Sequence, residues 1–138
     1  MKPFYLIFLV AMSFLSCSTS NDAPMDQDDM QMDNDMMETV ILSGDFVSVA
    51  HPTSGKATIS DSKTVLNFED FKTDNGPALE VYLATDNSAS TYITLGTLKG
   101  TNGNYEYTLP TNVDYAVYNH VIVWCVDFAV NFGYAVLK

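Results

Sequence analysis

The sequence predicts an all-β protein whose single domain, residues 39–138, is an antiparallel β-sandwich. No window shows a sustained helical apolar period, and short β-branched or aromatic runs recur between Gly, Pro, Asn and Asp. All seven glycines lie after residue 39, where methionine no longer occurs. A domain of about 100 residues is a common size for one hydrophobic core. These observations favour a sandwich of short strands over a helical or mixed fold.

The first half of the domain alternates short strands with turn signals. We expect strands at residues 39–42 and 46–50, separated by a turn at Ser43, Gly44 and Asp45. A second turn is expected at residues 51–55, where Pro52 has no N–H to give to a sheet. Strands at residues 56–60 and 63–68 follow, and then a loop at residues 70–77. Residues 79–83 alternate in polarity, which predicts a half-buried strand.

The second half contains the most apolar strand of the domain. Strands are expected at residues 92–95, 97–99 and 105–109, with a hairpin-type turn at residues 100–103. Residues 121–126 are apolar on both faces, which predicts a central strand covered on both sides. In that strand Cys125 points to one face and Trp124 to the other. Gly133 predicts a bulge or a close backbone approach before the closing strand at residues 134–137.

Residues 1–16 have the features of a secretory signal peptide. Lys2 supplies the positive start, and the apolar run that follows is too short to span a membrane. The end of this run, from Phe14 to Cys17, resembles the lipobox of bacterial lipoproteins. The resemblance implies that Cys17 carries lipid and anchors the protein to a membrane of the cell envelope, with the domain outside the cytoplasm. An ordinary secretory signal followed by an unmodified cysteine is the alternative.

Residues 17–38 are interpreted as the lipidated cysteine and a disordered linker. The segment from residue 18 is rich in Asp, with no basic or aromatic residue, and this composition is typical of a solvated spacer. It also holds five methionines, whose thioether sulfurs suit Cu(I), so metal binding is the alternative. These methionines are Met25, Met30, Met32, Met36 and Met37.

The charge of the chain bears on its partners. The formal net charge is −11, and loss of Lys2 with the signal peptide lowers it by one. Nucleic acid is therefore not an expected partner, because a strongly acidic protein is repelled by phosphate. The expected contact with the membrane is through the lipid anchor.

The role of the Cys125 thiol is the main functional question that the sequence raises. If Cys17 carries lipid, Cys125 has no partner for an intramolecular disulfide. It is then a buried thiol, a ligand, or half of an intermolecular bridge. The apolar residues around it predict a neutral buried thiol, because the thiolate is favoured only beside cations or helix N-termini.

A series of short motifs along the domain resembles the DM-thirteen domain family, from about residue 43 to residue 137. The residues that carry the resemblance are Gly44, Asp45, Phe46, Leu66, Asn67, Phe68, Phe71, Gly76, Pro77, Val81, Tyr82, Leu83, Leu95, Gly96, Leu98, Lys99, Gly100, Gly103, Tyr105, Tyr107, Thr108, Leu109, Pro110, Val121, Ile122, Val123, Trp124, Cys125, Phe132, Gly133, Tyr134 and Ala135. The resemblance implies a β-sandwich found in extracellular proteins, with an electron-transfer role centred on the family's cysteine. That cysteine corresponds to Cys125, and its redox partner would be a protein of the envelope.

The cofactor is left open by the sequence. The resemblance makes haem a candidate, with Cys125 as one axial ligand and His51 or His120 as the other. Covalent haem attachment is not expected, because there is no Cys-x-x-Cys-His motif. The same three residues match the ligand types of a blue-copper site, but no histidine follows the cysteine, so copper is disfavoured.

Two functions from different classes follow from these observations. The first is a lipid-anchored redox domain that acts through Cys125. The second is a surface-displayed binding or adhesion module, in which tyrosines supply contact area and Cys125 only packs in the core. No catalytic constellation is evident, so an enzyme is not expected.

Overall fold

The structure is a computed structural model that describes residues 39–138. The described residues form a single domain of eight antiparallel strands and no helix, which confirms the predicted fold class. The strands are β1 (Val40–Ser48), β2 (Thr53–Ser60), β3 (Val65–Thr73), β4 (Leu79–Ala84), β5 (Tyr92–Thr97), β6 (Asn102–Thr108), β7 (His120–Cys125) and β8 (Val130–Val136).

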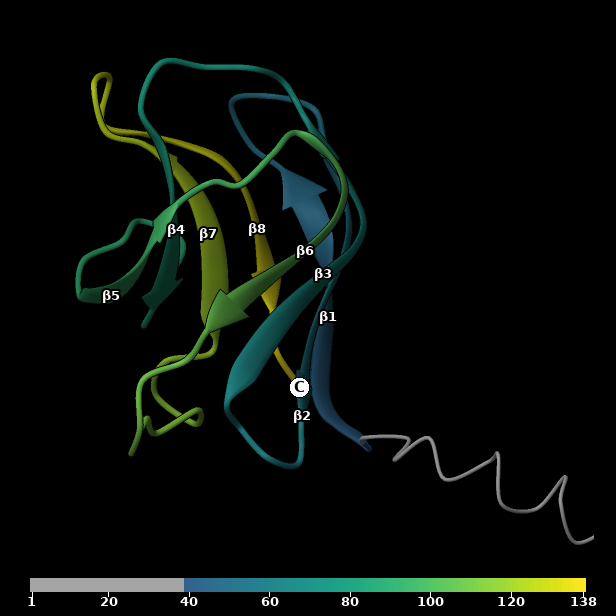
Figure 1. The fold of residues 1–138 in the computed structure, drawn as a ribbon. Helices are drawn as coiled ribbons and strands as arrows, with labels where there is room; N and C mark the ends of the chain where they lie inside the picture. Colours follow the sequence, from purple (N-terminus) through teal and green to yellow (C-terminus); the bar gives the residue numbers. More distant parts are fainter. Residues whose placement is uncertain (1–38) are drawn as a thin grey trace, which may run out of the picture. The chain divides into compact units, whose positions relative to one another are not determined.

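The strands are hydrogen-bonded in the order β5-β4-β7-β8-β1-β2-β3-β6. The sheet curls until its two edge strands, β5 and β6, approach each other, so that it forms a nearly closed barrel (Figure 1). Strand β1 belongs to both halves, because its first part pairs with β2 and its last part, from Phe46, pairs with β8. The two halves face each other across the core, as the layers of a sandwich do.

The turn predicted at Ser43, Gly44 and Asp45 is wrong, because β1 runs through these residues without a break. Gly44 serves a different purpose there. A Cβ atom at this position would collide with the backbone carbonyl of Val136 in β8. The glycine therefore permits the close contact at which β1 passes from one half of the barrel to the other.

Other expectations also differ from the structure, among them the turn at residues 51–55, because β2 already begins at Thr53, and the strand at residues 97–99, because β5 ends at Thr97. Strand β3 continues past residue 68 to Thr73, because a bulge with Asp70 at φ 47° allows Phe71 to reach the core as well. The hairpin expected at residues 100–103 is absent among the described strands, since β5 pairs with β4 while β6 pairs with β3. The connection instead crosses between the edge strands, held by Leu98 N–H to Leu79 C=O at one end.

The core lies between the two halves of the barrel and is dominated by aromatic side chains. Phe68 is at its centre, with ring centroids 4.9 Å from Phe46, 4.8 Å from Phe71 and 5.0 Å from Tyr107. Tilted and edge-to-face arrangements of this kind are the favourable ones for aromatic pairs. Val65 and Asn67 are only partly buried while Leu66 and Phe68 are fully buried, which confirms the predicted alternation of β3.

Strand β7 is covered on both sides, as predicted. Its inward residues join the main core, and Ile122 packs outside against Tyr82 and Ala84 of β4. The strand ends at Cys125, one residue before its predicted end, and Val126 lies in the following turn. The prediction for Gly133 is confirmed, because the β7–β8 register shifts beside it and a Cβ there would collide with Thr53.

The loop at residues 85–91 folds onto this outer cluster. Ala89 packs against the cluster, and Asn131 Nδ2 donates a 2.7 Å hydrogen bond to the Asn87 carbonyl. Within the loop, Asp86 accepts hydrogen bonds from Ser88 and Ser90, which hold the pKa of its carboxyl well below the usual range. The loop is thus fixed by its own polar contacts as well as by packing.

Candidate functional site

Cys125 is the last residue of β7 and its side chain is 0% exposed. It pairs in the sheet with Leu79 of β4 and with Val130 of β8. It belongs to the main core together with Val121 and Val123, which point inward from the same strand. The thiol is therefore buried in the hydrophobic core, as the apolar sequence around it predicted.

Trp124 lies on the opposite face of β7. Its ring packs with the outer cluster of Tyr82, Ala84 and Ile122, which is separate from the core that holds Cys125. The prediction that the tryptophan and the thiol do not share a face is confirmed. The cause is the two-residue period of side chains along a strand.

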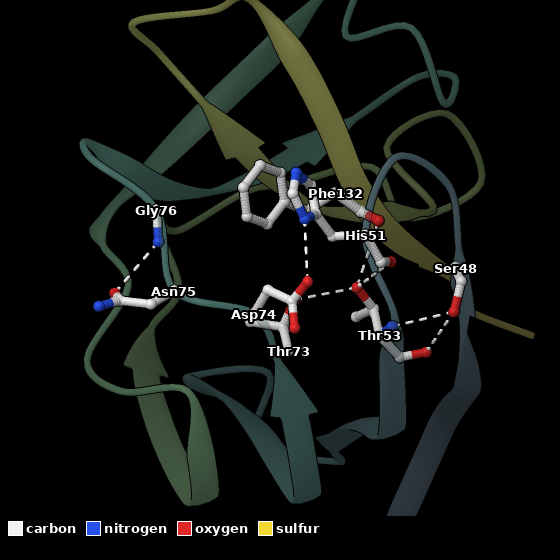
Figure 2. Close-up of polar contacts among 8 residues, drawn as sticks. All are labelled: Ser48, His51, Thr53, Thr73, Asp74, Asn75, Gly76 and Phe132. Atoms are coloured by element: carbon white, nitrogen blue, oxygen red, sulfur yellow. Dashed lines mark hydrogen bonds and ion pairs between the residues drawn. The ribbon is translucent and has the colours of Figure 1, made fainter.

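His51 lies in the β1–β2 loop, at the end of the barrel where Cys125 is also found. Its Nδ1 atom is 3.0 Å from Asp74 Oδ2, and its ring stacks on Phe132 with centroids 3.8 Å apart (Figure 2). The side chain of His51 is 38% exposed and that of Asp74 is 54% exposed. An exposed pair of this kind contributes little to stability, so its main effect is to orient the imidazole.

A hydroxyl network holds the loop that carries His51. The Oγ1 atom of Thr53 is 3.1 Å from the His51 carbonyl oxygen, 3.2 Å from the Phe132 carbonyl oxygen and 3.0 Å from Thr73 Oγ1 (Figure 2). Ser48 Oγ accepts a hydrogen bond from the Thr53 N–H at 2.9 Å. The hydroxyl groups of this network find their hydrogen-bond partners within it, so their role is to position the loop.

The structure does not bring His51 into contact with Cys125. A Cβ atom placed on Gly76 would meet both Phe132 and Leu79, so these two side chains are neighbours. His51 stacks on Phe132, and Leu79 is the sheet partner of Cys125. The imidazole therefore approaches the thiol only through apolar side chains.

His120 also lies away from Cys125. It begins β7, five residues before the cysteine, which corresponds to about 17 Å along a strand. Its ring stacks on Tyr134 and its Nδ1 atom is 2.7 Å from Asn119 Oδ1. Within residues 39–138 there is no group of three or more His, Cys, Asp or Glu side chains that could hold a metal ion.

A haem ligated by Cys125 does not fit this arrangement. The side chain of Cys125 has no exposed surface to which a porphyrin could have access. His51 and His120 lie in different places, each with its own partner. A porphyrin beside the sulfur would require the barrel to open.

Several predicted site residues lie outside the described residues. These are the lipidation site Cys17 and the candidate metal ligands Met25, Met30, Met32, Met36 and Met37. In the part of the chain that is described, no helix is long and apolar enough to cross a membrane.

Sequence reasoning missed two features of this region. One is Asp74, the partner of His51, which the sequence placed in a loop without a role. The other is a stack of three aromatic rings, Tyr92, Tyr82 and Trp124, on the outer face of the sheet. The alternation of residues 79–83 put Tyr82 on the face opposite Leu79, but only the pairing of β4 with β5 and β7 brings the rings together.

Comparison with known proteins gives one match. A family model described as Electron transfer DM13 matches residues 45–137, which is more than half of the chain and includes Cys125. No curated protein and no solved structure matches the chain.

Proposed function

This chain belongs to the electron transfer DM13 family, and from that membership we propose that it is a redox domain with Cys125 as its electron-exchanging group. The observation that carries the proposal is the family match itself, because it spans the barrel and contains Cys125, the one cysteine among the described residues. The partner would be a redox protein of the cell envelope.

The burial of Cys125 limits how the group can act. Thiol–disulfide exchange requires a thiolate to attack a second sulfur directly, and a sulfur with no exposed surface cannot be approached in that way. Electron transfer through the protein requires no such contact. Burial therefore favours electron exchange over disulfide chemistry, and it keeps the thiol from adventitious oxidation.

The redox proposal predicts that Cys125→Ala abolishes electron exchange by the purified full-length protein. The measurement is a spectroelectrochemical titration of the protein with soluble one-electron mediators. Val123→Ala is the matched control, because Val123 is a fully buried neighbour on the same inward face of β7 and its truncation leaves a comparable gap. Exchange should persist in this control. Equal exchange by wild type and Cys125→Ala would overturn the proposal.

A binding or adhesion module is the second candidate function. The observation in its favour is that Cys125 occupies the core as an ordinary packing residue does, with Leu79 and Val130 beside it. Under this alternative the wild-type protein neither takes up nor releases electrons in the same titration. Cys125→Ala then changes only stability.

We also propose that Cys17 is lipidated and anchors the protein to a membrane of the cell envelope. The support is the lipobox-like sequence from Phe14 to Cys17. Cys17→Ser is expected to move the protein from the membrane fraction to the soluble fraction, because the attached acyl chains provide the anchor. Cell fractionation with mass spectrometry of the mature N-terminus measures this, and Cys125→Ser is the control that should remain in the membrane fraction. Membrane retention of Cys17→Ser would contradict the proposal.

A further inference from the structure

Three aromatic rings form a stack across the outer face of three neighbouring strands. Tyr92 of β5 stacks on Tyr82 of β4, with centroids 4.0 Å apart and 12° between the ring planes. Tyr82 also stacks with Trp124 of β7, at 6.1 Å and 24°. Tyr92 is 49% exposed, Trp124 is half-buried and Tyr82 is almost fully covered. The stack therefore leads from the solvent-exposed edge of the sheet to the strand that holds Cys125.

The orientation of the rings distinguishes a binding platform for a flat ligand from a path for electron transfer. A platform for a flat ligand, such as a sugar, needs ring faces that are open to solvent. Here the face of Tyr82 is occupied by Tyr92, and Tyr82 is only 4% exposed. Nearly parallel rings in contact are instead suited to passing an electron from one π system to the next.

The inner end of the stack is next to the thiol along the chain. Trp124 and Cys125 are consecutive residues, and consecutive Cα atoms are about 3.8 Å apart across a trans peptide bond. The two side chains point to opposite faces of the sheet. A single peptide unit thus connects a buried thiol to an aromatic ring on the outside of the barrel.

The phenol at the centre of the stack has a proton acceptor beside it. Burial, a hydrogen bond with Tyr92 and the nearby carboxylate of Glu80 raise the pKa of Tyr82. The phenol therefore remains protonated at neutral pH. The carboxylate of Glu80 lies beside this phenol and can take its proton when an electron is withdrawn.

We propose that Tyr92, Tyr82 and Trp124 form an electron relay between the surface of the protein and the residue adjoining Cys125. This inference rests on the proposed redox function. The partner is a one-electron oxidant that approaches the exposed ring of Tyr92.

The electrons and protons balance in each step. The oxidant gains one electron from the exposed ring of Tyr92, and Tyr92 regains one from Tyr82. As Tyr82 loses its electron, its O–H proton passes to Glu80, which leaves Tyr92 unchanged, a neutral tyrosyl radical at Tyr82 and a neutral carboxyl group. An electron from the Trp124 indole then reduces the radical as the proton returns from Glu80. The net result is a reduced oxidant and an oxidised indole beside Cys125, with Tyr82 and Glu80 restored.

Flash photolysis of the full-length protein tests the relay. A soluble ruthenium polypyridyl complex, oxidised by light and a quencher, serves as the one-electron oxidant, and transient absorption records the indole radical. Trp124 is the only tryptophan, so this signal reports on a single residue. Tyr82→Phe keeps the ring but removes the oxidisable phenol, and it is expected to lower the yield of the indole radical several-fold.

Tyr134→Phe is the matched control. Tyr134 lies on the same outer face but stacks on His120, outside the three-ring stack, so its replacement should leave the yield unchanged. Circular dichroism verifies that each variant is folded. Tyr92→Phe, at the exposed end of the stack, provides a second variant with the same expected loss if Tyr82→Phe is unfolded. An indole radical that forms equally well in both stack variants would show direct oxidation of Trp124 and overturn the relay.

The same measurement on Cys125→Ala separates the relay from the proposed function. The relay ends at the indole, so the yield of the indole radical in Cys125→Ala should equal that of wild type. A loss of yield in Tyr82→Phe, together with equal electron exchange by wild type and Cys125→Ala in the mediator titration, would support the relay and count against Cys125 as the redox group. An unchanged yield in the stack variants overturns the relay whatever Cys125 does.

Discussion

Phe68→Ala is expected to lower the free energy of unfolding by about 4 kcal/mol, because it removes a fully buried ring and leaves a cavity. The ring is in contact with Phe46, Phe71 and Tyr107, so its loss affects both halves of the barrel. Small domains are typically stable by about 5–15 kcal/mol, and the variant should therefore be close to unfolding. Urea denaturation followed by circular dichroism measures the change.

The chain offers a matched control for this substitution. Phe128 is in the turn between β7 and β8 and is 73% exposed, so Phe128→Ala makes the same chemical change without a cavity. Its effect should be within about 0.5 kcal/mol of zero. Equal effects of the two substitutions would mean that Phe68 is not at the centre of the core.

Gly44→Ala is expected to destabilise the domain by about 3 kcal/mol, since the new methyl group would overlap the backbone carbonyl of Val136. A long side chain could move away from such a contact, but a carbonyl within a paired strand cannot do so without disturbing the sheet. The loss should appear as a lower urea midpoint with an unchanged slope.

Asp45→Ala is the control for Gly44→Ala, because Asp45 is the next residue of β1 and its side chain is exposed. Its carboxylate is 3.9 Å from Lys56 Nζ, and an exposed ion pair of this kind has an effect of at most about 1 kcal/mol. Wild-type stability of Gly44→Ala would indicate that β1 and β8 can separate at this point. The transfer of β1 from one half of the barrel to the other would then not depend on glycine.

The position of Cys125 restricts the ligands that its sulfur can share and the way in which it can exchange electrons with a partner. The sequence allowed a ligand shared with His51 or His120, but these side chains are held by Asp74 and Asn119 in separate parts of the domain. A thiol with no exposed surface can exchange electrons with a partner only through the protein. The stack of Tyr92, Tyr82 and Trp124 offers such a route on the outer face of the sheet, opposite to the face of Cys125.

Much of the candidate site could be predicted from alternation along single strands. Residues 121–126 indicated a covered central strand, with Cys125 and Trp124 on opposite faces, and both features are present. The contact of His51 with Asp74 could not be predicted, because it joins two loops that are 23 residues apart. The aromatic stack was missed for the same reason, since β4, β5 and β7 are neighbours only in the folded sheet.

The sequence by itself determined the fold class, the faces of most strands and the irregularity at Gly133. These properties are local, because a strand places successive side chains on alternate faces whatever its neighbours are. Only the tertiary structure decided which strands pair, why β1 needs Gly44, and which side chains surround Cys125. Strand pairing depends on how the whole sheet buries its apolar faces, so no short stretch of sequence specifies it.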